Sequence, residues 1–132
     1  MALGMSTALR NARLDAITSA VGSAGKLRLY AGTRPATGGT ATTLLGEFTC
    51  GSPFAGAAAS GVLTLNPVAA DSAADNTGTA TWARLLKSDN TFVMDLDVSV
   101  AGGSGDLTMD NVAVVAGATL TPGSMSITDA NP

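Results

Sequence analysis

Histidine is absent from the 132 residues of this chain, and cysteine occurs only once, as Cys50. The lack of histidine removes the commonest general base and the commonest metal ligand of proteins, which excludes histidine-dependent catalysis. A single cysteine cannot form an internal disulfide framework or a cysteine-based zinc cluster. The sequence therefore predicts a protein that is not an enzyme, with no catalytic residues, no metal site and no cofactor.

Long apolar runs are missing as well. No stretch approaches the ~18 consecutive apolar residues that indicate a membrane-spanning helix. Arg10, Arg13 and Asp15 interrupt the region where a secretion signal would have its apolar segment. We therefore expect a soluble product made in the cytoplasm, without a membrane partner.

Charged and aromatic residues are scarce, at 13% and 4% of the chain. Small side chains take their place, with 24 Ala, 17 Thr, 16 Gly and 11 Ser. The net charge is only −3 and 45% of the residues are hydrophobic, which is unlike a disordered chain. The length fits one folded domain. Small, weakly charged side chains suit close repeated packing on a lattice, because few costly surface groups must be ordered.

The few charges are unevenly distributed along the chain. Residues 1–34 contain five basic residues and one acidic residue, whereas residues 35–132 contain two basic and nine acidic ones. Such asymmetry can mark a nucleic-acid contact, but the five basic residues are scattered and form no basic tract. The N-terminal part of one copy meeting the acidic body of another explains them equally well. We expect further copies of the chain as partners, and no specific nucleic acid.

The first predicted element is a helix, which Ser6 or Thr7 can cap and Gly22 or Gly25 can end. Apolar residues recur along one face at three- and four-residue spacing, namely Met5, Leu9, Ala12, Ala16 and Ala20, and the apolar side is widened by Leu14, Ile17 and Val21. Such a short helix is marginal alone and must pack on something. It either covers one end of its own domain or is an arm that docks on a neighbouring subunit, and we favour the arm.

From residue 26 onward the apolar pattern has a period of two, which is typical of half-buried strands. The clearest unit is a β-hairpin over residues 79–98 that turns at 88–90. The expected strands cover residues 26–31, 44–50, 62–65, 79–86, 92–98, 106–109, 112–116 and 124–128.

About eight short strands with frequent turn signals predict a mainly β fold. We expect an antiparallel β-sandwich or jelly-roll-like barrel with an N-terminal α-helix. In this organisation residues 1–25 are the helix or arm, and residues 26–132 are the β-sandwich domain.

Several residues could carry chemistry, but each has a simpler structural explanation. Asp95 and Asp97 stand two apart on one strand and could contribute to a calcium site or to a glycosidase pair. A solvated strand face that discourages edge pairing explains them better. Trp82, Tyr30 and Phe92 could stack a sugar or a base, but on alternating strands we expect them to be core or interface anchors. Cys50 is expected to be a small buried apolar residue.

A succession of segments gives the chain a resemblance to a known class of proteins. These segments are 26–35 (KLRLYAGTRP), 44–48 (LLGEF), 78–84 (GTATWAR), 93–98 (VMDLDV), 106–107 (DL) and 114–117 (VVAG). The succession resembles small virion structural proteins of tailed bacteriophages and covers most of the chain after the helix. The resemblance implies a capsid decoration or minor capsid role beside the major capsid protein in the phage head, and it supplies no catalytic residue.

The leading hypothesis is therefore a capsid decoration (cement) or minor capsid protein that binds the head in many copies and stabilises it. The alternatives are a tail, baseplate or fibre component involved in assembly or host-surface binding, and a small hydrolase, which the missing histidine disfavours. Contacts to the major capsid protein or to further copies are expected from the helix and from basic residues of the N-terminal part. The residues concerned are Leu9, Arg10, Arg13, Leu14, Ile17, Val21, Arg28 and Arg34.

Overall fold

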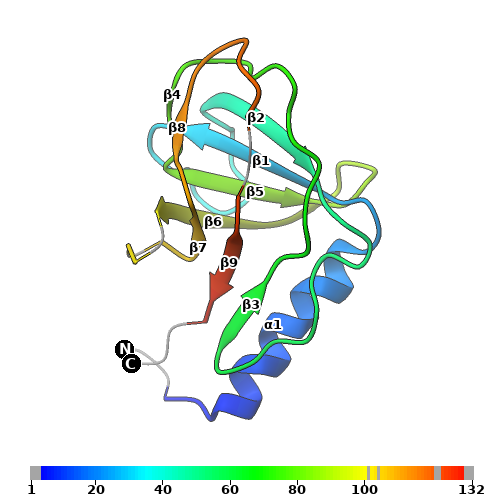
Figure 1. The fold of residues 1–132 in the computed structure, drawn as a ribbon. Helices are drawn as coiled ribbons and strands as arrows, with labels where there is room; N and C mark the ends of the chain where they lie inside the picture. The colour runs from blue at the N-terminus through cyan, green and yellow to red at the C-terminus, as the bar shows by residue number, and fades with distance from the viewer. Residues whose placement is uncertain (1–3, 101, 104, 121–122, 130–132) are drawn as a thin grey trace.

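The fold combines one helix with a strongly bent sheet, as seen in a computed structural model that describes residues 4–100, 102–103, 105–120 and 123–129 (Figure 1). Helix α1 spans Thr7–Val21. The strands of the chain are β1 Lys26–Ala31, β2 Thr43–Thr49, β3 Val62–Thr64, β4 Gly78–Thr79, β5 Trp82–Leu86, β6 Phe92–Val100, β7 Leu107–Met109, β8 Ala113–Val114 and β9 Met125–Thr128. The prediction of a mainly β, sandwich-like fold with an N-terminal helix is confirmed.

Helix α1 begins and ends where its capping residues predict. The Ser6 hydroxyl accepts the Leu9 N–H at 3.2 Å, and the Gly22 N–H donates to the Thr18 carbonyl at 3.2 Å. Gly22 has a φ of 72°, in the left-handed region that glycine enters without a steric penalty.

The buried face of α1 differs from the predicted narrow face. Leu14 and Val21 are each 2% exposed, and Ile17 is partly buried against the same core. Leu9, Ala12, Ala16 and Ala20 point outward and are exposed. The helix turns its larger apolar side chains inward because these remove more apolar surface from water than alanine does.

Seven of the strands form one sheet in the order β2-β1-β5-β6-β7-β9-β3, and β4 pairs with β8 separately. The long strand β6 connects the two parts of this sheet. It pairs antiparallel with β5 through Phe92–Asp97 and parallel with β7 through Val98–Val100. The parallel pair departs from the expected all-antiparallel sheet. It overlaps by only three residues, so the chain needs only a short return after Val100.

The helix and the strands share one hydrophobic core. Leu14 and Val21 of α1 belong to the same buried cluster as the strand side chains that face the interior, such as Leu29, Leu85 and Leu107. Residues of the N-terminal helix and of the β region thus contribute to one core. In Figure 1 the helix runs diagonally beside β3, below the part of the sheet that contains β1, β5 and β6.

Both outer strands of the sheet are covered by other parts of the same chain. Along β2, the residues between 69 and 76 bond to backbone groups of Leu44, Leu45, Glu47 and Thr49. Beside β3, Ala59 exchanges two backbone hydrogen bonds with Val62. Covered edges do not offer unpaired backbone groups to a neighbouring strand.

Candidate functional site

The first candidate site lies on the face of the sheet away from α1, under the loop of residues 32–42. Arg84 on β5 and Asp95 on β6 are directly opposite each other, and Arg84 Nε is 2.7 Å from Asp95 Oδ1. The loop fastens to this pair, because the Gly38 N–H donates to Asp95 Oδ2 at 3.0 Å and Arg84 Nη2 donates to the Gly39 carbonyl at 2.8 Å. Each partner of the ion pair therefore also holds the loop in place.

Burial and hydrogen bonding have opposite effects on Asp95. Burial alone would raise the pKa of this carboxyl group, but hydrogen bonds from Arg84 and the Gly38 N–H, with the charges of Arg84 and Arg34, lower its pKa below the ordinary value. The hydrogen bond with Asp95 raises the pKa of Arg84. The pair is therefore ionised at neutral pH and has the character of a structural ion pair.

Asp95 corrects the expectation of a solvated acidic strand face. Its side chain is 1% exposed, and β6 has strands on both sides in the sheet order. Asp97, two residues along, is 55% exposed and lies 3.1 Å from Arg34 Nε. The two carboxylates share a face, as the spacing predicts, but the loop with Arg34 and Gly38 covers one of them.

Three aromatic residues lie around Arg84 on this face, and two of them are buried. The rings of Tyr30 and Trp82 stack with centroids 4.3 Å apart, and Trp82 Nε1 donates to Thr42 Oγ1 at 2.9 Å. The Arg84 guanidinium lies between the rings of Trp82 and Phe92, at 5.3 and 5.4 Å from their centroids. Trp82 and Tyr30 are buried, which agrees with core anchors, and Phe92 is 38% exposed.

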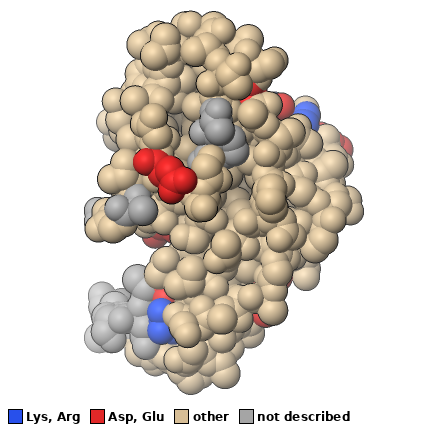
Figure 2. Space-filling view, viewed as in Figure 1, with Lys and Arg blue, Asp and Glu red and all other residues tan. Residues whose placement is uncertain are grey.

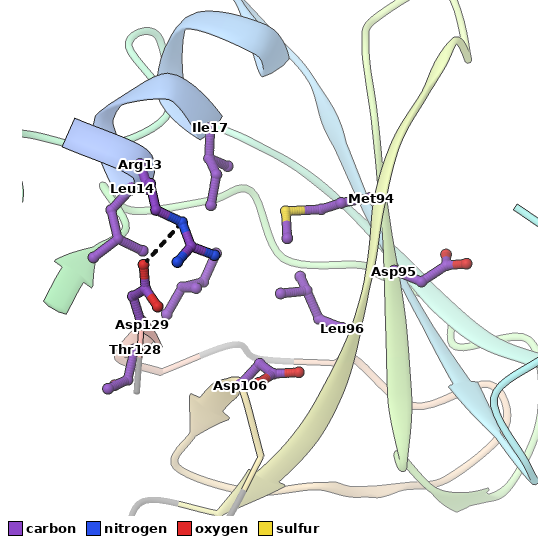
Figure 3. Close-up of a pocket in the computed structure, with 10 residues that line it drawn as sticks. Arg13, Leu14, Ile17, Met94, Asp95, Leu96, Asp106, Thr128 and Asp129 are labelled. Atoms are coloured by element: carbon purple, nitrogen blue, oxygen red, sulfur yellow. Dashed lines mark ion pairs between the residues drawn. The ribbon is translucent and has the colours of Figure 1, made fainter. Parts of the chain in front are cut away.

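The second candidate site is a groove on the opposite face, between α1 and the sheet, with a volume of about 330 Å³ (Figure 3). Leu14 and Ile17 of α1 approach it from one side, and Met94 and Leu96 of β6 face them. Ile127 of β9 completes the apolar lining. The polar residues Arg13, Asp106, Thr128 and Asp129 also line this space, which we name the α1 groove.

The residues of the α1 groove were only partly expected from the sequence. Its helix residues belong to the predicted apolar side of the helix, but nothing local to Met94, Asp106 or Asp129 indicates a groove. These residues come from segments far apart in sequence, which only the sheet topology brings beside the helix. An alternating strand pattern could have assigned Met94 and Leu96 to one face, but not to a cavity.

The expected partner-contact residues fall into two groups, and the apolar group is largely occupied within the chain. Leu14 and Val21, which were expected to contact a partner, are buried in the protein's own core. Ile17 is partly buried against the same core. Leu9 alone of this group projects outward, and 50% of it is exposed.

The basic group is also engaged within the chain. Arg10 Nε donates to the Asp129 carbonyl at 2.8 Å, and Arg13 Nε lies 3.4 Å from Asp129 Oδ2. Arg28 pairs with Glu47 at 2.5 Å, and Arg34 pairs with Asp97. The basic N-terminal part thus meets the acidic body of its own chain, which accounts for the uneven charge without a second copy.

Cys50 is 4% exposed, as expected of a small buried residue, and burial raises the pKa of its thiol to about 12.

Within the described ranges no three His, Cys, Asp or Glu side chains gather where they could hold a metal ion. Of the helical segments that the structure describes, none has the length and apolarity to cross a membrane.

Comparison with protein-family models, with curated proteins and with solved structures finds no match for this chain.

Proposed function

We propose that this protein is a non-enzymatic structural protein of a tailed-bacteriophage virion, a capsid decoration or minor capsid protein that binds the head in many copies. Its partners in this proposal are the major capsid protein and further copies of the chain. The proposal starts from the resemblance of segments such as 26–35 and 78–84 to small virion proteins.

The observation that carries the proposal is the weakly charged surface of small side chains. On the face drawn in Figure 2, charged atoms form a few small islands in an uncharged surface. Arg13, Arg28, Arg34 and Arg84 are each paired with a carboxylate of the same chain. Such a surface suits crowded neighbours, because contact with it orders few long side chains and leaves few charges to desolvate.

Multiple attachment would provide the stabilising effect. A protein that binds at many equivalent positions of a shell contributes many weak contacts, each formed at high effective concentration. A tail, baseplate or fibre component is the second candidate. Exposed Leu9, Phe92, Val100 and Val115 are apolar positions through which such a component could contact its neighbours.

Quantitative mass spectrometry of phage heads and tails separated on a density gradient tests the proposal. We expect the chain in the head fraction at a copy number comparable to that of the major capsid protein. A few copies confined to the tail fraction would favour the second candidate, and absence from both fractions would refute a virion role. The major capsid protein and a tail-tube protein serve as markers of clean separation.

A further inference from the structure

Strand β6 has an edge that the sheet uses only in part. One edge of β6 pairs with β5 from Asp97 back to Phe92, whereas the other edge pairs with β7 only at Val98–Val100. Within the described part of the chain, no strand pairs with the first half of β6 on the β7 side. We name the unpaired edge of residues 92–97 the half-edge. Unlike the covered edges of β2 and β3, it offers backbone groups to an incoming strand.

The direction of the backbone groups follows from the ladder. In an antiparallel pair, the N–H and C=O groups of alternate residues face the partner strand. The Val98 N–H donates to the Thr81 carbonyl on the β5 side, so Leu96 faces β5 as well. The N–H and C=O groups of Asp95 and the N–H of Asp97 consequently face the half-edge, whereas the Asp97 carbonyl lies where the parallel ladder with β7 begins.

Two side chains already bond to this half-edge as a strand would. Asp106 Oδ2 accepts the Asp97 N–H at 3.2 Å, and Arg34 Nη1 makes a long contact of 3.5 Å with the Asp95 carbonyl. Side chains can be displaced by backbone groups of the same polarity at little cost, because each broken hydrogen bond is replaced. Some backbone groups of the half-edge are therefore hydrogen-bonded to side chains, and an incoming strand could replace those side chains.

The α1 groove lies beside this half-edge and would receive the side chains of an added strand. Met94 and Leu96 project from β6 toward Leu14 and Ile17 across the groove, while Asp95 projects to the opposite side (Figure 3). A volume of about 330 Å³ accommodates one or two apolar side chains. The combination of a strand edge with an adjoining apolar space is the arrangement used for β-strand addition of extended peptides.

One carboxylate at the groove, that of Asp106, indicates which side chains an added strand should carry. Arg13 pairs with Asp129, and Arg34 with Asp97, but within the described residues Asp106 forms no ion pair. Asp106 is exposed and lines the groove. A lysine or arginine on the incoming segment would supply the missing opposite charge.

We propose that the first half of β6 and the α1 groove bind an extended segment of another polypeptide, with an apolar side chain in the groove and a basic side chain beside Asp106. The backbone of the segment pairs with Asp95 and takes the place of the Asp106 carboxylate at the Asp97 N–H, and its side chains alternate between the groove and solvent. This inference concerns peptide recognition and does not depend on the virion role proposed above.

The test uses the full chain and a heptapeptide, Lys-Val-Lys-Leu-Lys-Val-Lys, with fluorescein on its N-terminal amine and an amidated C-terminus. We expect saturable binding by fluorescence anisotropy, and chemical-shift changes at the Asp95 and Asp97 amides by NMR. Substitution of every lysine by glutamate in the peptide should abolish binding. Two further peptides carry N-methyl groups on alternate residues, on the lysines or on the apolar residues. Only one of these sets should lose binding, because only alternate residues of an added strand face β6.

Variants of the chain separate the contributions. Met94→Glu should weaken binding about tenfold or more, since it removes apolar contact in the groove. Asp106→Asn should weaken it about two- to fivefold at low salt, and this difference should disappear at high salt. Val115→Glu is the matched control, because Val115 is 61% exposed and is not part of the groove.

Three results would overturn the proposal. Equal binding of both N-methylated peptides would exclude strand addition, and this readout uses the unchanged chain, so it does not depend on how any variant folds. Unchanged affinity of the Met94→Glu variant would exclude the α1 groove. A dimer of the peptide-free chain in analytical ultracentrifugation that Met94→Glu dissociates would assign the half-edge to a second copy instead.

Discussion

Arg84 and Asp95 face each other across β5 and β6, with Arg84 Nε 2.7 Å from Asp95 Oδ1 and with side chains that are 13% and 1% exposed. Neither residue is isolated, because each also bonds to the backbone of the loop at Gly38 or Gly39. The pair thus joins two strands and the loop of residues 32–42.

Removing one member of this pair should be strongly destabilising. We expect Asp95→Asn or Arg84→Met to lower the free energy of unfolding by about 3–5 kcal/mol, because each leaves a buried group without its partner. Chemical denaturation followed by circular dichroism measures this change. The double variant should lose less than the sum of the two single variants, and a strictly additive result would contradict the coupling.

The pair also predicts how stability depends on pH. The folded protein holds the pKa of Asp95 below its ordinary value of 3.8, so ionised Asp95 stabilises the folded state above that value. This stabilisation is lost as the pH falls from about 4 through the lowered pKa. Urea midpoints measured at descending pH should show the loss, and in Asp95→Asn this part of the pH dependence should be absent.

Two leucines of α1 provide a matched pair for the role of the helix. Leu14→Ala should cost about 2–5 kcal/mol, because Leu14 is 2% exposed in the core. Leu9→Ala should change stability by no more than about 0.5 kcal/mol, because half of Leu9 is in solvent. Thermal melting of both variants distinguishes a helix that belongs to the core from a detachable arm, which would leave both melting temperatures unchanged.

Cys50 should be unreactive in the folded protein. Its thiol is buried, and a pKa of about 12 leaves almost no thiolate at neutral pH. We expect a thiol-specific chromogenic disulfide to modify Cys50 only as fast as the protein opens, and to modify it at once in denaturant. The double variant Cys50→Ala, Val115→Cys, with its exposed thiol, should react without delay. Prompt reaction of the native chain would show that Cys50 is accessible.

Elements defined by local chemistry were predictable from the sequence. The candidate caps, Ser6 or Thr7 and Gly22 or Gly25, placed the helix ends to within a few residues, and the structure uses Ser6 and Gly22. Alternation placed the hairpin of β5 and β6 with its turn at residues 88–90. These signals involve residues close in sequence, so no tertiary information is needed. The side of α1 that turns inward depends instead on what lies opposite, so the sequence indicates an apolar side but not which part of it is buried.

The candidate sites were harder to predict for the same reason. Arg34 and Asp97 are 63 positions apart, and Arg13 and Asp129 are 116 positions apart, yet each pair forms an ion pair. Charge counts along the chain gave the excess of each sign but not the partners. With one sequence, an internal pair and a contact between copies look identical, and only the fold distinguishes them.

The position of β9 has a consequence for the order in which the chain can acquire its structure during synthesis. β9 lies between β7 and β3, so β3 cannot join the main sheet until residues 125–128 have emerged from the ribosome. Asp129, which both Arg10 and Arg13 contact, emerges later still. The hairpin of β5 and β6 can form early because its partners are adjacent in sequence. Completion of this sheet therefore follows the synthesis of β9, after all the other strands of the sheet have been made.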